Sequence, residues 1–198
     1  MSTRSCLAYK TKEGWEGTYC HWDGYPTNRG VQIWDILMKE FILNKGKPGV
    51  SNDGNITKAL QAFVNIYING HKGGWSSFPD ECYCHSPEFV MRDGVEDDEM
   101  ETDKTADALF IEWVYVIDAE DKKLLIYIGG RAEGSHKNTS ANGIGEWKSL
   151  NYKHYLVESI DLNPDVKEPD WEDIESKGGK IREEMSEKFK EEVKANNG

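Results

Sequence analysis

The chain has 198 residues with 24 basic and 36 acidic side chains, so its formal net charge is −12. Nucleic-acid binding draws on clustered Lys and Arg that contact phosphates, and this acidic balance argues against nucleic acid as a direct partner. The charge fits a partner that is itself basic, or it serves only to keep the protein soluble. The length suits one domain, with or without a tail.

Neither the N-terminus nor the interior of the sequence predicts a targeting or membrane segment. The first residues lack the apolar stretch of a signal peptide. The longest apolar run, near residues 109–117, is interrupted by Glu112 and is too short to span a bilayer. We therefore expect a cytoplasmic protein without a membrane partner, in which the four cysteines are reduced.

The first third of the chain predicts a β-hairpin followed by two amphipathic helices. Strand-forming residues flank a glycine turn, and apolar residues then recur at helical spacing in two separate runs. Asp53 or Asn55 is the expected N-cap of the second helix, since either side chain can accept a backbone hydrogen bond there. The expected elements are strands over residues 5–10 and 17–23 and helices over residues 28–44 and 55–68.

The remainder of the chain predicts a second hairpin, one more strand and a charged helix. A long irregular stretch over residues 71–108 comes first, and its part over residues 93–107 reads as a solvated acidic loop. The second hairpin is apolar on both faces, so we expect it to lie centrally in a sheet. The expected elements are strands over residues 109–118, 123–128 and 152–162 and a helix over residues 180–195.

These elements predict an α+β fold with a largely antiparallel sheet. We expect one α+β domain over residues 1–163, which contains the sheet and the two amphipathic helices, and a charged C-terminal helical extension over residues 164–198. The apolar stripe of that last helix is thin. Two interpretations of this helix follow: the stripe docks the helix on the body of the protein or on a partner, or the helix is a solvated tail.

Side chains that carry chemistry gather in the segment Tyr-Cys-His-Trp-Asp-Gly-Tyr-Pro at residues 19–26. On an extended strand, Tyr19, His21 and Asp23 share one face, and Cys20 and Trp22 share the other. Aromatic and ionisable residues in turns make a plausible pocket or a protein hot spot, or else a cluster that only pins the long loop to the sheet. The predicted binding residues are Tyr19, His21, Trp22, Asp23, Tyr25, Trp75 and His85.

Cysteine and histidine spacing leaves a zinc site open as an alternative. Cys20, Cys82, Cys84 and His85 supply the ligand types that zinc prefers. Their spacing is not that of a standard finger, and Cys20 can equally be a small buried apolar side chain. We therefore expect that the protein binds no cofactor, and zinc is the alternative.

Acid–base chemistry is a second alternative. His21 and Asp23 can join Asp80, Glu81 or His85 to hold a divalent ion or to move protons. No fixed catalytic spacing supports this arrangement. The simpler interpretation is that Asp23 braces the following turn while His21 bonds a backbone carbonyl. The sequence leaves enzymatic activity uncertain and favours a protein that is not an enzyme.

The N-terminal segment resembles a group of short proteins from bacteriophages and gut bacteria for which no activity is established. They begin with Met-Ser-Thr/Ser-Arg, followed by a strand and the motif Tyr-x-His-Trp/Tyr-Asp-Gly-Tyr-Pro, which match residues 1–4 and 19–26 here. Residues 112–118 and 73–76 also look like this group, so the resemblance covers about half of the chain. The motif cysteine often differs in these proteins, which leaves His21 and Asp23 as the better site candidates.

This resemblance implies a non-catalytic, phage-type binding protein that blocks a host defence protein, in the manner of an anti-CRISPR protein. By analogy, an acidic or aromatic surface would imitate nucleic acid toward a host partner, for instance a basic nucleic-acid-binding protein. A phage-encoded protein of this kind would act in the host cell cytosol. The alternative function is a small metal-dependent hydrolase or a nucleotide-ligand-binding protein that uses His21, Asp23 and His85.

Overall fold

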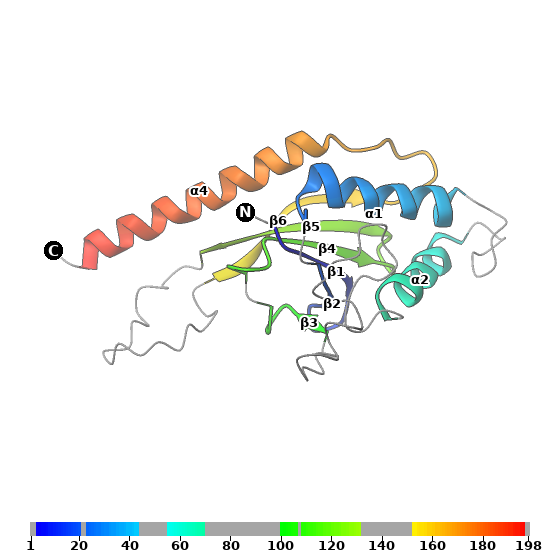
Figure 1. Ribbon diagram of the computed structural model, residues 1–198, viewed down its shortest axis with the longest axis horizontal. Coiled ribbons are helices and arrows are strands. Elements are labelled where there is room, and N and C mark those ends of the chain that lie inside the picture. Colours follow the sequence, from blue (N-terminus) through cyan, green and yellow to red (C-terminus); the bar gives the residue numbers. More distant parts are fainter. Residues whose placement is uncertain are drawn as a thin grey trace, which may run out of the picture.

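The computed structural model describes residues 3–20, 23–43, 55–69, 100–106, 108–131 and 152–196. These residues form a six-stranded sheet in the order β3-β2-β1-β4-β5-β6, with helices packed against one face (Figure 1). The predicted α+β fold with a largely antiparallel sheet is confirmed. The strands are β1 (Ser5–Lys10), β2 (Trp15–Cys20), β3 (Glu101–Thr102), β4 (Trp113–Asp118), β5 (Lys123–Arg131) and β6 (Tyr152–Asp161).

One neighbouring strand pair in this sheet is parallel. β1 pairs with β4 in parallel, with Leu7 opposite Tyr115, and the other neighbouring pairs are antiparallel. Both parallel strands therefore end at the same edge of the sheet, β1 at Lys10 and β4 at Asp118. A parallel connection requires a long crossover, and the helical segments between β2 and β4 provide it.

The first hairpin differs from the prediction at its second strand. β2 begins at Trp15, two residues before the predicted segment, and Asp23 already lies outside the strand. Asp23 has a positive φ of 48°, and the backbone N–H of Gly24 donates to the carbonyl of Thr3 at 2.9 Å. The chain therefore folds back around the start of β1 at the residues where the prediction continued the strand.

Both amphipathic helices form near the predicted positions. The first is a continuous helical run with π-helical turns at both ends: η1 (Pro26–Gly30), α1 (Val31–Ile36) and η2 (Leu37–Ile42). Pro26 suits the first helical position for two reasons. Its φ is fixed near the helical value, and an N–H at this position would have no hydrogen-bond partner within the helix, so proline loses nothing by lacking one. In α2 (Ile56–Tyr67) the Asn55 side chain accepts a hydrogen bond from the Lys58 N–H, so the predicted cap is confirmed.

The C-terminal helix is longer than predicted. α4 (Trp171–Asn196) begins nine residues before the predicted start and continues through Gly178 and Gly179. A side chain at Gly178 would collide with the Trp113 ring, whereas nothing lies within 4 Å of the corresponding position at Gly179. The helix continues through the glycine pair, and Gly178 leaves room for the Trp113 ring of β4.

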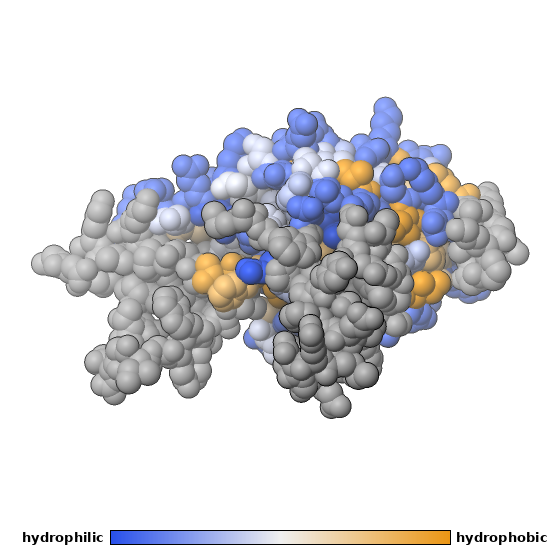
Figure 2. Space-filling view, in the orientation of Figure 1, coloured by the Kyte–Doolittle hydropathy of each residue, from blue (hydrophilic) through white to orange (hydrophobic). Residues whose placement is uncertain are grey.

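α4 is anchored in the domain from its first turn. Trp171 and Ile174 are buried in the main core, and the Trp171 ring lies against Gly30 of η1. Farther along, Arg182 forms an ion pair with Glu112 at 2.6 Å. The outward surface of α4 is mostly hydrophilic (Figure 2). Ile181 of the predicted apolar stripe packs against the main core, and the side chains of Phe189 and Val193 lie outside the described residues.

The central strands are buried on both faces, as their sequence predicts. All six residues of β4 are buried; Tyr115 and its alternate neighbours face the helices, and Val114 and Val116 face a smaller cluster on the other side. β4 itself is shorter than the predicted 109–118, because Leu109 and Phe110 are exposed and precede the strand. None of the helices in the described residues combines the length and apolar character that crossing a membrane requires.

Candidate functional site

The structure places two members of the predicted aromatic site on opposite faces of the sheet. Tyr19 packs against the smaller cluster, which contains Trp15, whereas Tyr25 packs against the helix-covered core. Burial raises the pKa of the Tyr19 phenol, and the nearby Arg4 guanidinium opposes that shift. Asp23 is exposed in the turn between the two tyrosines. The predicted residues His21, Trp22, Trp75 and His85 lie outside the described residues, so their convergence stays a prediction.

Cys20, the described member of the predicted zinc set, is a buried core residue. Its side chain is 3% exposed and belongs to the helix-side core, as expected for a cysteine that acts as a small apolar side chain. Cys82, Cys84 and His85 lie outside the described residues. Among the residues that the structure describes, no three His, Cys, Asp or Glu side chains are grouped to hold a metal ion.

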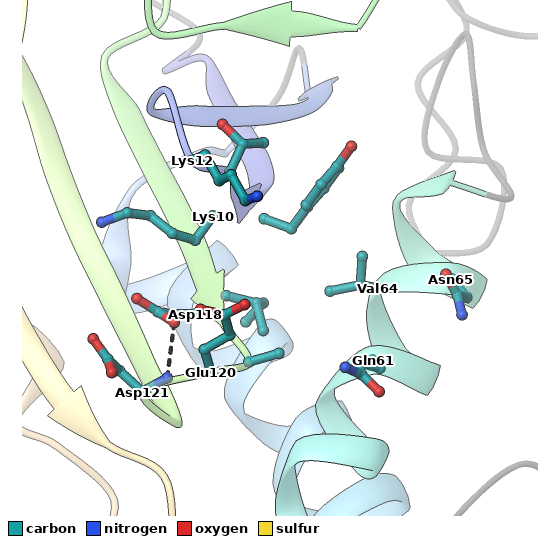
Figure 3. Close-up of a pocket in the computed structure, with 12 residues that line it drawn as sticks. Lys10, Lys12, Gln61, Val64, Asn65, Asp118, Glu120 and Asp121 are labelled. Atoms are coloured by element: carbon teal, nitrogen blue, oxygen red, sulfur yellow. Dashed lines mark hydrogen bonds between the residues drawn. The ribbon is translucent and has the colours of Figure 1, made fainter.

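A groove of about 620 Å³ opens where the two parallel strands end, a place the sequence did not single out (Figure 3). The turn after β1, the turn after β4 and one side of α2 form its walls. We call it the β1/β4 groove. It is lined by Tyr9, Lys10, Thr11, Lys12, Gln61, Val64, Asn65, Ile117, Asp118, Ala119, Glu120 and Asp121.

The floor of the β1/β4 groove is apolar and fixed. Val64 and Ile117 are buried members of the core, and the Tyr9 ring packs beside them. The Tyr9 hydroxyl donates a hydrogen bond to the Glu16 carboxylate at 2.6 Å. This bond is the largest cause that raises the pKa of Tyr9 to about 12.

The acidic wall of the groove is held by its own turn. Asp118 is 5% exposed, and its carboxylate accepts a hydrogen bond from the backbone N–H of Asp121 at 3.0 Å. Aspartate at the start of a turn stabilises it in this way. Lys122 then takes a left-handed φ of 55°. With the backbone fixed, the side chains of Glu120 and Asp121 are presented to solvent at the rim.

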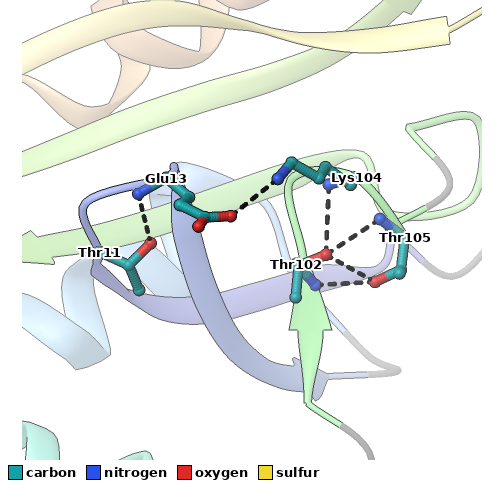
Figure 4. A network of polar contacts seen from close by, with 5 residues as sticks. All are labelled: Thr11, Glu13, Thr102, Lys104 and Thr105. Carbon is teal, nitrogen blue, oxygen red and sulfur yellow. Dashed lines mark hydrogen bonds and ion pairs between the residues drawn. The ribbon is translucent and has the colours of Figure 1, made fainter.

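The basic wall is braced by contacts with residues 101–105 (Figure 4). The Thr11 hydroxyl accepts a hydrogen bond from the Glu13 N–H, and Glu13 forms an ion pair with Lys104 at 3.0 Å. Thr102 organises the facing turn by accepting hydrogen bonds from the N–H groups of Lys104 and Thr105. Both partners of the ion pair are highly exposed, so the turn structure contributes more than this pair to holding Lys12 in position.

Charges of both signs line the groove without neutralising one another. Among the described residues, no ion pair or hydrogen bond engages the side chains of Lys10, Lys12, Glu120 or Asp121. In contrast, Lys39, Lys104, Lys123 and Lys177 elsewhere on the surface each pair with a carboxylate. Within the described part of the chain, the groove therefore differs from these surface sites in carrying charged side chains without an ion-pair partner.

The described lining of the groove combines an apolar floor with charged and polar side chains at its rim. Its lining contains no His, Cys or Ser, and its two hydroxyl groups are already engaged, that of Tyr9 with Glu16 and that of Thr11 with Glu13. An apolar floor with a few polar groups around it is typical of small-ligand sites.

Comparison with known proteins gave no match. No family matches the chain, and no curated protein or solved structure is significantly similar to it. The resemblance of the N-terminal segment to phage and gut-bacterial proteins therefore stays a prediction.

Proposed function

We propose that this protein is a non-catalytic binding protein whose ligand occupies the β1/β4 groove. The observation that supports this proposal is the set of unpaired charged side chains around an apolar floor where β1 and β4 end. In open sheets, the carboxyl ends of parallel strands leave room for a ligand beside the connecting segments. Here the connecting helix α2 closes that space on one side.

The proposal is tested by screening small-molecule fragments against the native chain with two-dimensional NMR. Fragments that bind in the groove are expected to shift the backbone signals of Thr11, Gln61, Asn65 and Ala119. Gln61→Trp places an indole at the groove wall and should abolish these shifts. Ile66→Trp is the matched control, because Ile66 is exposed on the same helix but does not line the groove.

A fragment that binds equally well to the Gln61→Trp and Ile66→Trp variants does not occupy the groove. If all fragments that bind behave in this way, the proposal is wrong. Circular dichroism of both variants separates loss of binding from loss of folding.

A basic protein partner remains a separate prediction, and one described surface favours it. Residues 161–173 carry six acidic side chains and one lysine, and all six acids are exposed. Such a surface would attract a basic partner and speed its association. Replacing Asp165, Asp170 and Glu172 with their amides should weaken capture of a basic host protein, whereas the same number of changes at Glu13, Asp35 and Glu40 should not.

A further inference from the structure

The two kinds of charge occupy neighbouring parts of one groove wall. Figure 3 shows Gln61, Val64 and Asn65 of α2 on one side of the β1/β4 groove and the charged residues on the other. The lysines, Lys10 and Lys12, belong to the β1 end and the turn that follows it. The acids Asp118, Glu120 and Asp121 belong to the β4 end and its turn.

This arrangement selects against ligands with a single charge. A purely anionic ligand would meet three carboxylates beside the lysines, and a purely cationic ligand would meet two ammonium groups beside the acids. The side chains of like charge would repel each such ligand and offset part of its attraction to the others, and both effects are moderated by solvent because Lys10, Lys12, Glu120 and Asp121 are exposed. A ligand that carries one charge of each sign can satisfy both parts of the wall at once.

The uncharged lining adds two further requirements. Gln61 and Asn65 are exposed carboxamides on successive turns of α2. Gln61 offers both hydrogen-bond donors and an acceptor, whereas the Asn65 Oδ1 already accepts a hydrogen bond from the Asn69 Nδ2 at 3.2 Å, so Asn65 offers mainly its donors. These groups match the N–H and C=O of a peptide bond. The floor made by Val64 and Ile117 offers apolar contact to a side chain. The cavity volume falls within the range that small organic ligands occupy in proteins.

Resting on the function proposed above, we infer that the ligand of the β1/β4 groove is a short peptide with both termini free. Its C-terminal carboxylate contacts Lys10 and Lys12, and its N-terminal ammonium contacts Glu120 and Asp121. Its peptide groups bond to Gln61 and Asn65, while an apolar side chain rests on the floor formed by Val64 and Ile117.

Calorimetric titration of the native chain with the tripeptide glycyl-leucyl-glycine tests this inference. The free tripeptide is expected to bind in the groove, and binding should be lost in the Gln61→Trp variant. Blocking one terminus, by N-acetylation or by C-amidation, removes one charge-assisted contact and should weaken binding about tenfold. Blocking both termini should abolish binding at the same peptide concentrations.

Variants that neutralise one charged side chain test which terminus of the peptide contacts the lysines and which contacts the acids. Lys12→Gln, which keeps Lys10, should reduce the preference for the free over the C-amidated tripeptide and leave the discrimination against the N-acetylated form unchanged. Glu120→Gln should show the opposite pattern. Lys167→Gln and Asp165→Asn are matched controls at exposed positions away from the groove, and both should retain the native preference.

Two results would overturn the inference and leave the proposed function standing. In the first, all four forms of the tripeptide bind alike in the groove. In the second, no tripeptide binds, although fragments from the screen bind and are blocked by Gln61→Trp. If neither peptides nor fragments reach the groove, the proposed function is wrong as well.

Discussion

The two ends of the parallel strand pair are built in opposite ways. At the end where β4 begins, bulky aromatic side chains meet glycines: Trp171 lies against Gly30, and Trp113 lies against Gly178. At the end where both strands finish, the β1/β4 groove is open and carries unpaired charges. We call these the closed end and the open end. The closed end contributes packing to the fold, whereas the open end carries the groove in which we propose that a ligand binds.

The largest effect on stability is expected from Trp171→Ala at the closed end. Trp171 is 7% exposed, contacts Trp34 edge-to-face at 6.2 Å between ring centroids, and donates a hydrogen bond to Glu168 at 3.0 Å. Removing a buried tryptophan costs about 3–5 kcal/mol, a large part of the stability of a typical domain. Urea denaturation should show this loss. Trp171→Phe keeps a ring over Gly30 and should lose clearly less stability; equal losses would contradict the packing role.

The glycine pair in α4 gives the sharpest test of the closed end. Gly178→Ala introduces a methyl group that collides with the Trp113 ring and should lower the free energy of unfolding by about 1–3 kcal/mol. Gly179→Ala meets open space and should raise it by about 0.5–1 kcal/mol, because alanine favours the helix. Chemical denaturation of both variants measures the difference. The same sign of effect in both would contradict the docking of α4 on β4.

A smaller loss is expected from Asn55→Ala, at the start of the helix that forms one wall of the open end. The Asn55 side chain accepts the Lys58 N–H, and removing such a cap costs about 1 kcal/mol. Thr57→Ala in the same first turn removes no cap and should change stability by less than about 0.5 kcal/mol. Thermal unfolding of the two variants decides whether the cap contributes, and indistinguishable midpoints would contradict it.

The smallest effect concerns the Tyr9 phenol at the groove floor. Its folded-state pKa is about 12, above the ordinary value of 10.0, mainly because Tyr9 donates a hydrogen bond to Glu16. The resulting stabilisation is complete below pH about 10 and is lost as pH rises through about 12. NMR of ring-labelled tyrosine measures the titration. Glu16→Gln should lower the pKa of Tyr9 toward its ordinary range, and an unchanged pKa would contradict the assignment to Glu16.

Local patterns predicted the elements well where neighbouring residues decide the structure. The spacing of apolar residues located both amphipathic helices, and Asn55 acts as the predicted cap. The alternation in β4 and β5 indicated strands buried on both faces, which is confirmed. In each case the residues that determine the element lie within about one or two turns of one helix, or within one strand. Over this range, the periodicity of apolar residues indicates which side chains are buried.

Contacts between distant parts of the chain could not be predicted in this way. The parallel pairing joins residues 5–9 with residues 113–117, and no local pattern specifies such a partner. The β1/β4 groove depends on that pairing, so the sequence showed Lys12 and Glu120 only as residues of polar turns. Likewise, the sequence placed the start of the last helix after Gly178 and Gly179, and no local pattern showed that Gly178 lies against Trp113.

The aromatic motif shows where strand periodicity ceases to apply. Alternation predicted that Tyr19 and Asp23 would share a face, but the chain turns at Asp23, where φ is 48°. Tyr25 then enters the helix-side core, while Tyr19 remains on the other face. Tyr19 and Tyr25 therefore do not share one pocket, and the described site with unpaired charges is the β1/β4 groove.

The most direct test of the central claim is the chemical-shift map of the native chain in the fragment screen. The account predicts that fragments shift the signals of Thr11, Gln61, Asn65 and Ala119 at the open end and leave Gly30 and Gly178 at the closed end unchanged. Shifts confined to the closed end, or shifts at the open end that persist in the Gln61→Trp variant, would contradict it.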